Sequence, residues 1–302
     1  MLSPGVRLVE RPGALHFVDG RRVVSLRTDD ATRAAIRAAL AERGAAPEAG
    51  APVDDELRDD VYVLLAELGL LQPGGTSIAD ATTAFAGASA GRHLDADRVL
   101  DRLRGIAVHV LGDADGVVGR ALADSGLRCR DLSAPLAERS LDPRHDLVVA
   151  VADPARPASS LRAVNAACVD AGVTWLPISA YDGAVLRVGP LVVPGGTACY
   201  ECTERRLAAN AEYSDLYRDV VADAPAVPAP PTVLAWAASV AALSLLAWIG
   251  GADARVPGRL LTLSPADLAL RSATVFRVPR CPVCASPDHL HAAAPWAVAR
   301  DH

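Results

Sequence analysis

Two Cys-x-x-Cys motifs constrain the fold of this chain more than any other feature. The first comprises Cys199 and Cys202, and the second comprises Cys281 and Cys284. Two cysteines at this spacing can direct both sulfur atoms at one ion, and two such motifs supply the four thiolates that zinc takes in a closed structural site. The spacing therefore predicts a structural zinc ion that leaves no coordination position for a reacting water. Four buried cysteines or two disulfides are the alternatives.

Composition limits the partners and the compartment. With 302 residues, of which 51% are hydrophobic and 22% charged, the chain is typical of a globular protein large enough for two domains. Its net charge of −6 provides no basic field, so we expect neither nucleic acid nor a membrane as a partner. Cys129 and Cys168 stand outside the two motifs, a usage typical of the reducing cytoplasm. The first residues contain no apolar segment of signal-peptide length, so we expect a cytoplasmic protein that is not exported.

Residues 1–72 predict a small winged-helix-like module. Three short β-rich runs are separated by Pro-Gly and Asp-Gly turn signals, and two helical patterns follow, with Thr28 as the expected cap of the first. The second helical pattern is strongly acidic, which is the wrong sign for binding a DNA backbone. A peptide added as a further strand along the edge of the meander fits better. The alternative is a subdomain that only packs on its neighbour.

Residues 73–105 are interpreted as a linker followed by a connecting helix. From residue 106 an apolar run ends in glycine and precedes a helix, and strand and helix patterns then alternate as far as residue 178. We therefore predict an α/β fold in which residues 106–302 form a Rossmann-like domain with a zinc-closed C-terminal lobe. The apolar stretch 232–250 is long enough to span a membrane, but we expect it to be a buried core or dimer helix.

The nucleotide-binding signal in the first turn of this domain is weak. The glycines are spaced G-x-x-x-G-x-x-G, and Asp113 and Asp115 would place two carboxylates beside a pyrophosphate. The chain also contains no lysine, since all 30 of its basic residues are arginine, so no lysine can clamp a phosphate or form a Schiff base. We therefore expect a vestigial nucleotide site at Gly112, Gly116, Gly119 and Asp131, the last near the spacing of a ribose-binding acid.

Residues 146–153, 189–202 and 278–284 resemble the ThiF/MoeB adenylating superfamily. Within it they most resemble the ThiF-like partner proteins of YcaO cyclodehydratases. Those partners are the leader-peptide-binding proteins of thiazole/oxazole-modified microcin and related RiPP pathways. The resemblance covers nearly the whole chain, because these proteins also begin with a winged-helix RiPP recognition element.

The resemblance implies roles for individual residues. It assigns the zinc ligands to the two Cys-x-x-Cys motifs, and it matches Asp153 to the magnesium-binding aspartate of active members. The missing lysine and the acidic turn imply the inactive branch, in which the protein binds no ATP and a separate YcaO subunit uses it. In recognition elements of this kind the leader lies against the third strand and the last helix. Here those contacts fall on Arg22, Val23, Val24, Ser25, Leu26, Val61, Tyr62, Leu65 and Leu68.

We therefore predict a non-catalytic scaffold, expected to be a homodimer, that binds the leader of a ribosomal precursor peptide. It would present the core of that peptide to a YcaO-type cyclodehydratase or a comparable modifying enzyme. The alternative is an ATP-dependent enzyme that adenylates the C-terminus of a peptide or a carrier protein. A nicotinamide-dependent Rossmann enzyme is a poorer alternative, because no general acid or base stands out and hydride transfer does not need a zinc tetrathiolate.

Overall fold

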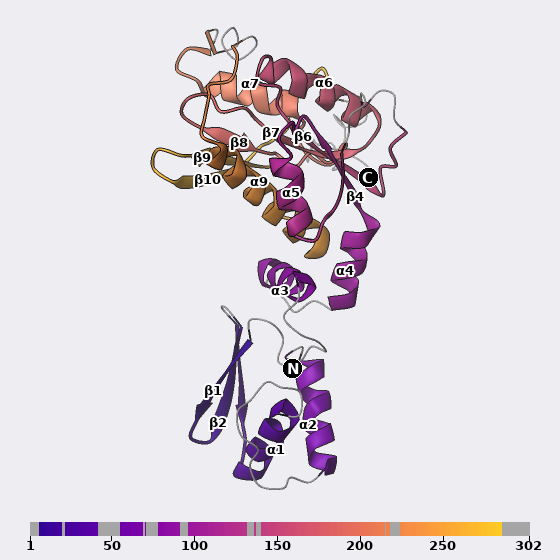
Figure 1. Cartoon of the computed structure of the whole chain (residues 1–302), viewed down its shortest axis with the longest axis vertical. Coiled ribbons are helices and arrows are strands. Elements are labelled where there is room, and N and C mark those ends of the chain that lie inside the picture. Colours follow the sequence, from indigo (N-terminus) through magenta and orange to yellow (C-terminus); the bar gives the residue numbers. More distant parts are fainter. Residues whose placement is uncertain are drawn as a thin grey trace, which may run out of the picture. The chain divides into compact units, whose positions relative to one another are not determined.

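The computed structural model describes residues 6–19, 22–41, 55–68, 70, 78–90, 96–131, 136, 140–214, 216–217 and 224–285. Contacts between Cα atoms divide the chain into two compact units (Figure 1). The first unit comprises Met1–Arg102 with Gly250–Ala252, and the second comprises Leu103–Ile249 with Asp253–His302. The first unit thus includes the residues predicted as the winged-helix-like module and most of those interpreted as the linker.

The first unit begins with a three-stranded antiparallel sheet, which two helices follow. The strand order is β1-β2-β3, so each strand pairs with the next one in the chain. Pro12 and Gly13 form the first turn, as the sequence predicted. Of the second predicted turn signal, Asp19-Gly20, Asp19 is the last residue of β2 and residue 20 lies outside the described residues. The elements are β1 (Val6–Arg11), β2 (Ala14–Asp19), β3 (Arg22–Arg27), α1 (Asp30–Ala41) and α2 (Asp55–Glu67).

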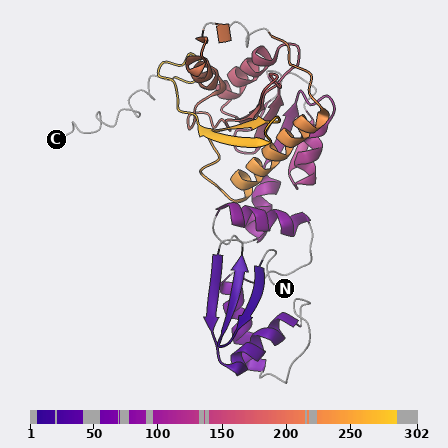
Figure 2. The same cartoon turned by 90° about the vertical axis from the view of Figure 1, so that its left-hand side faces the viewer.

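One face of this sheet packs against both helices (Figure 2). Leu15 and Phe17 of β2 contact Ile36 and Leu40 of α1 and Leu65 of α2, and each of these side chains is at most 1% exposed. Fully burying an aliphatic or aromatic side chain of this size stabilises a fold by about 1.5–3 kcal/mol. The sheet and its two helices therefore share a hydrophobic core of their own.

Two local predictions need correction. The cap of α1 is Asp29 rather than Thr28, because the Asp29 Oδ1 accepts the Thr32 N–H at 2.7 Å. The segment 73–91, interpreted as a linker, contains α3 (Ile78–Ala90). Its alanines favour a helix without producing the apolar period on which the interpretation relied. The predicted connecting helix is present as α4 (Ala96–Gly105).

The second unit is built on a seven-stranded sheet of order β10-β9-β8-β7-β6-β4-β5. Strands β5, β4, β6 and β7 are parallel, and β8, β9 and β10 each run antiparallel to their neighbours. The expected alternation of strands and helices is confirmed from β4 to β7. The elements are β4 (Ala107–Leu111), α5 (Val117–Asp124), β5 (Arg128–Asp131), β6 (Asp146–Val151), α6 (Pro157–Asp170), β7 (Thr174–Ile178), β8 (Leu186–Val188), α7 (Tyr200–Asn210), α9 (Pro231–Leu245), β9 (Arg259–Ser264) and β10 (Ala269–Thr274).

Helices cover both faces of this sheet (Figure 1). On one face α6 packs on β6 and β7 and contacts α7, whereas on the other α5 and α9 pack against each other and α9 contacts β7 and β8. Because both faces are covered, the central strands β4, β6 and β7 are almost entirely buried, and their sequences are nearly continuous apolar runs.

The apolar helix α9 continues as a π-helix, Leu246–Gly250, and together they are long and apolar enough to cross a membrane. No other helix of the described residues passes that test of length and composition, which the core helix of a soluble protein also passes. Ala237, Ala238 and Leu245 are fully buried, and 61% of the most apolar 18-residue window is buried. This burial agrees with the expectation of a core helix.

Candidate functional site

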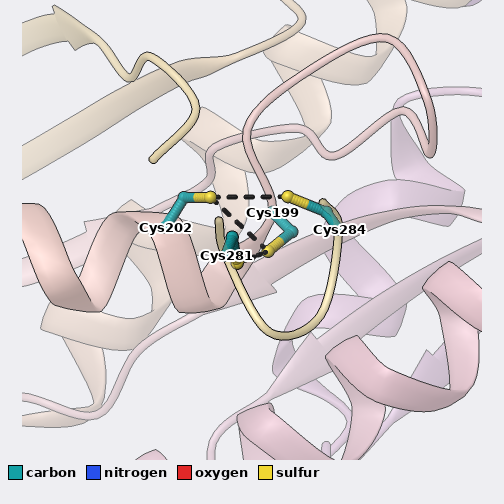
Figure 3. A group of neighbouring side chains, drawn as sticks. All are labelled: Cys199, Cys202, Cys281 and Cys284. Carbon is teal, nitrogen blue, oxygen red and sulfur yellow. Dashed lines mark hydrogen bonds between the residues drawn. The ribbon is translucent and has the colours of Figure 1, made fainter. Parts of the chain in front are cut away.

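Both Cys-x-x-Cys motifs meet at the N-terminus of α7 (Figure 3). Cys199 is the N-cap residue and Cys202 lies in the first turn, so the helix directs both sulfur atoms to one side. A turn at residues 279–284 brings Cys281 and Cys284 to these sulfur atoms. All four Sγ atoms lie within 4.8 Å of one another.

The separations between the sulfur atoms fit a tetrahedral metal ion. The Sγ atom of Cys199 lies 3.9 Å from that of Cys202 and 3.7 Å from that of Cys281, and the Sγ atoms of Cys202 and Cys284 are 3.5 Å apart. A tetrahedral ion with metal–sulfur bonds of about 2.3 Å places its sulfur ligands about 3.8 Å apart. A disulfide requires about 2.05 Å, and all four cysteines are free. The four residues could therefore hold one metal ion, as the spacing predicted.

The surroundings of the sulfur atoms favour the thiolate form of one cysteine, Cys202, and hydrogen bonds hold the second motif in place. Hydrogen bonds from the Cys199 and Cys284 thiols lower the pKa of Cys202, whose Sγ also accepts the Val278 N–H at 3.3 Å. The guanidinium of Arg206 donates to the carbonyl of Arg277 at 2.8 Å, and the Arg277 Nε donates to the Thr197 carbonyl at 2.9 Å. Residues before each motif are thus hydrogen-bonded to the other segment, which positions the ligands independently of an ion.

The predicted nucleotide residues lie at the topological switch point of the sheet. The chain turns to opposite sides after β4 and β6, which is where open α/β sheets bind ligands beyond the carboxyl ends of their strands. Gly112 and Asp153 line one cavity of about 500 Å³ there. Gly112 has φ 78°, and a Cβ atom at this position would lie 2.4 Å from the Val151 carbonyl oxygen. Close packing of β4 on β6 therefore requires this glycine whether or not a nucleotide binds.

The side chain of Asp113 occupies the N-terminus of α5. Its Oδ2 accepts the Gly119 N–H at 2.7 Å, and its buried Oδ1 has no hydrogen-bond partner among the described residues. An N–H group in the first turn of a helix is what a bound phosphate would use. Gly116, with φ 65°, is the N-cap, and Asp115 is exposed. The glycine turn thus carries an anion of its own where a phosphate would accept hydrogen bonds.

The structure describes the side chain of only one of the two predicted acidic ligands of the nucleotide, Asp153. Asp153 Oδ1 accepts the Ala155 N–H at 2.8 Å, so part of its carboxylate stabilises the turn after β6. Asp131 is the last residue of β5 and pairs with Val110 of β4, but its side chain lies outside the described part of the structure. The structure therefore brings Gly112, Asp113 and Asp153 to the same end of the sheet and leaves the ribose position open.

The register of the first sheet identifies the free edge of β3. The Thr28 N–H donates to the Gly13 carbonyl at 3.3 Å, and hydrogen-bonded pairs recur at every second residue of an antiparallel ladder. Residues 22, 24 and 26 therefore form the hydrogen-bonded pairs with β2. The backbone N–H and C=O groups of Val23, Ser25 and Arg27 point away from β2. No strand of the described chain pairs with that side of β3, so these N–H and C=O groups are available to an added strand.

The apolar residues predicted to contact a peptide divide into two sets. Val24, Leu26 and Leu68 are partly buried at the border of the core. Val61 and Leu65 are 5% and 0% exposed, so they support the fold and have almost no surface for a peptide. The predicted peptide contacts omitted the exposed apolar residues of α2, Val63 and Leu64, although the apolar stripe read from the helical spacing included Leu64. Val23 is 57% exposed and Ser25 is exposed, whereas the side chains of Arg22 and Tyr62 lie outside the described residues.

Comparisons with known proteins show the fold of the chain. The chain matches no protein-family model and no curated protein. A heterocyclase solved in complex with substrate and cofactor matches over 97% of this chain and 40% of its own, with 20% identity and a TM-score of 0.69. For the heterocyclase TruD the shares are 97% and 43%, with 20% identity and a TM-score of 0.64. E. coli MccB with MccA-N7isoASN matches over 94% of this chain and 99% of its own, with 17% identity and a TM-score of 0.60.

MccB has also been solved with ATP, and that structure matches with a TM-score of 0.58 and 16% identity. The chain thus spans less than half the length of the two heterocyclases but nearly the whole of MccB. At these identities the likeness confirms the predicted mixed α/β fold and goes no further.

Proposed function

We propose that this protein binds the leader of a ribosomally made precursor peptide and presents the core to a YcaO-type, azoline-forming cyclodehydratase. The free edge of β3 carries the proposal, because its outward N–H and C=O groups are what an added peptide strand needs. The likeness of the fold to heterocyclases and to MccB, which was solved with MccA-N7isoASN, supports a role in peptide maturation. We further propose that the protein acts in the cytoplasm as a homodimer.

Backbone pairing along β3 would give affinity with little sequence choice. Apolar leader side chains would then lie on Val24, Leu26 and Leu68, the partly buried residues at the border of the core. Helix α2 contains Asp55, Glu56, Asp59 and Asp60, so a basic leader residue beside the apolar anchors would be favoured.

For the metal centre we propose zinc in a structural role. Zinc is the ion that four thiolates at tetrahedral spacing favour, and a closed tetrathiolate has no open position for a substrate or a reacting water. The ion would join the start of α7 to the turn at residues 279–284 and would take no part in a reaction.

We propose that the scaffold is not itself an enzyme. The carboxylate of Asp113 at the start of α5 and the absence of lysine both weigh against phosphate binding in this unit. One observation favours the alternative, an ATP-dependent adenylating enzyme: Gly112 and Asp153 still line a cavity of about 500 Å³ at the switch point, and MccB has been solved with ATP.

The leader proposal is tested by a proline at the free edge. Val23→Pro removes an N–H group that faces away from β2, which an edge strand tolerates. Fluorescence anisotropy with a labelled leader from a precursor encoded beside this protein should show a loss of at least about tenfold, since a hydrogen bond is lost and the ring obstructs the added strand. Val23→Ala keeps the N–H and should bind within about threefold of the wild type. Equal binding by both variants, or no binding by the wild type, would contradict the proposal.

A further inference from the structure

The second unit contains a cavity that neither the metal centre nor the nucleotide turn uses. It has a volume of about 280 Å³ and lies between the start of α6, the end of β7, the first turns of α7 and residues 224–227. Most of its lining is apolar, with Leu161, Pro177 and Leu260 as examples. Residues 224–227 are held in place because the Ala226 N–H donates to the Pro154 carbonyl at 2.7 Å and the Val227 N–H to the Tyr181 carbonyl at 3.0 Å.

One carboxylate oxygen in this apolar lining has no hydrogen-bond partner among the described residues. Glu204 is only 8% exposed, and its Oε2 is buried with no hydrogen-bond partner among the described residues. The Tyr200 hydroxyl, Arg162 and Arg187 interact with this carboxylate, so the atom left without a partner is Oε2 alone. A buried charged atom without a partner is costly, so each one in a native fold calls for an explanation, and a bound ligand is one such explanation. Nothing in the sequence singles out this glutamate, because its surroundings come from distant segments.

The arginines close to Glu204 are already paired. Arg187, which also lines the cavity, lies 3.0 Å from Asp182, and Arg162 lies 3.7 Å from Glu201. A second cavity of about 370 Å³ shares Glu204 and Tyr217 with the first, so Glu204 lies between the two cavities. Among the charged residues described in the lining of the first cavity, Glu204 is therefore the one that forms no ion pair, although Arg162 and Arg187 lie close enough to act on its charge.

We propose that this cavity binds a primary ammonium group carried on a short apolar chain, with Glu204 as its counter-ion. The ammonium provides a positive charge and three N–H donors, one of which would satisfy the Oε2 of Glu204. The apolar walls would bury the alkyl chain, and two aromatic residues of the kind that can attract a cation, Tyr200 and Tyr217, also line the cavity. The group is either a free alkylamine or an amine carried by a peptide. This proposal does not rest on leader binding at β3.

Calorimetric titration of the full-length protein tests the proposal with n-butylammonium, n-butanol and N-acetyl-lysine amide as probes. Butylammonium should bind about tenfold or more tightly than butanol, which has a similar shape and no charge. Glu204→Gln should weaken butylammonium binding by about tenfold or more, whereas Glu212→Gln, the same change at an exposed carboxylate outside the lining, should leave it unchanged. Tighter binding of the lysine probe than of butylammonium identifies the peptide source, and the reverse identifies a free amine.

Ala226→Phe is the second variant and keeps the proposal testable if Glu204→Gln does not fold. The larger side chain enters the cavity from a partly exposed position, so it should reduce the binding of butylammonium without altering the core. Equal affinities for butanol and butylammonium would overturn the proposal. So would butylammonium binding that neither Glu204→Gln nor Ala226→Phe changes, because the site would then lie elsewhere.

Discussion

Replacing Cys284 by serine tests the metal centre most cleanly. Cys284 is the one ligand of the four that is not fully buried, so the change removes a thiolate with little loss of packing. Cys129→Ser is the matched control, because Cys129 is also partly buried and lies outside both motifs. A difference between the two variants therefore reports the metal and not the removal of a sulfur atom.

The loss of folding stability expected for Cys284→Ser can be calculated from the length of the chain segment that the ion would close into a loop. Cys202 and Cys281 are 79 positions apart, and a cross-link that closes a loop of this length stabilises the fold by about 4.5 kcal/mol in the chain-entropy treatment. The hydrogen bonds of Arg206 and Arg277 already hold the same segments together, so the ion supplies only part of this. We expect Cys284→Ser to lose about 2–4 kcal/mol, which corresponds to a fall in Tm of about 5–15 °C.

Metal analysis and thermal unfolding measure both consequences. Wild-type protein purified without added zinc should contain about one zinc ion per chain, and the Cys129→Ser variant should have the same zinc content. EDTA should lower the Tm of the wild type to that of Cys284→Ser, and it should leave the Tm of that variant unchanged. A wild type that contains no metal, and that melts at the same temperature with and without EDTA, would refute the structural-metal reasoning.

Three further outcomes can be checked. Titration of the wild type with ATP and magnesium should give no saturable heat at millimolar concentration, whereas saturable binding that Asp153→Ala removes would favour the adenylating enzyme. Leu65→Ala should cost the first unit about 2–5 kcal/mol and weaken leader binding through the fold alone, and an unchanged urea midpoint would contradict the packing described. Since burial raises the pKa of Glu204, the folded state binds this proton more tightly than the unfolded state, so stability should fall as pH rises through the raised pKa. Glu204→Gln should flatten that fall in urea unfolding followed from mildly acidic to neutral pH.

The cluster of four cysteines could be predicted from the sequence because the information that specifies it is local. The spacing of Cys199 and Cys202 fixes two sulfur atoms on one side of a helix start, and the same holds for the second motif in its turn. The parallel strands were also predictable, since burial on both faces demands apolar runs such as the one before Gly112. The helix α3 was missed because Ala and Thr do not mark a buried face by their pattern, even though alanine favours a helix.

The peptide surface was predicted less well, for a reason that lies in the helical stripe itself. A stripe at i, i+3 and i+4 marks the residues that a helix buries against its own domain, and Val61 and Leu65 are such residues. Val63, which lies outside the stripe, and Leu64, which lies within it, are both exposed, so the stripe does not separate core residues from residues that are free to meet a partner. The direction of each N–H group in β3 depends on the ladder register, which the sequence alone does not specify.

Gly112 and Asp113 carry separate information, although they are neighbours in one turn. A side chain at Gly112 would collide with the Val151 carbonyl, so close packing of β4 on β6 keeps the glycine even where no nucleotide is bound. A glycine in this turn therefore predicts the fold of the unit and is weak evidence for a ligand. Asp113 bears on the ligand, because its carboxylate already accepts the Gly119 N–H that a phosphate would need. Any nucleotide would have to displace that carboxylate and overcome its charge, without a lysine anywhere in the chain to compensate.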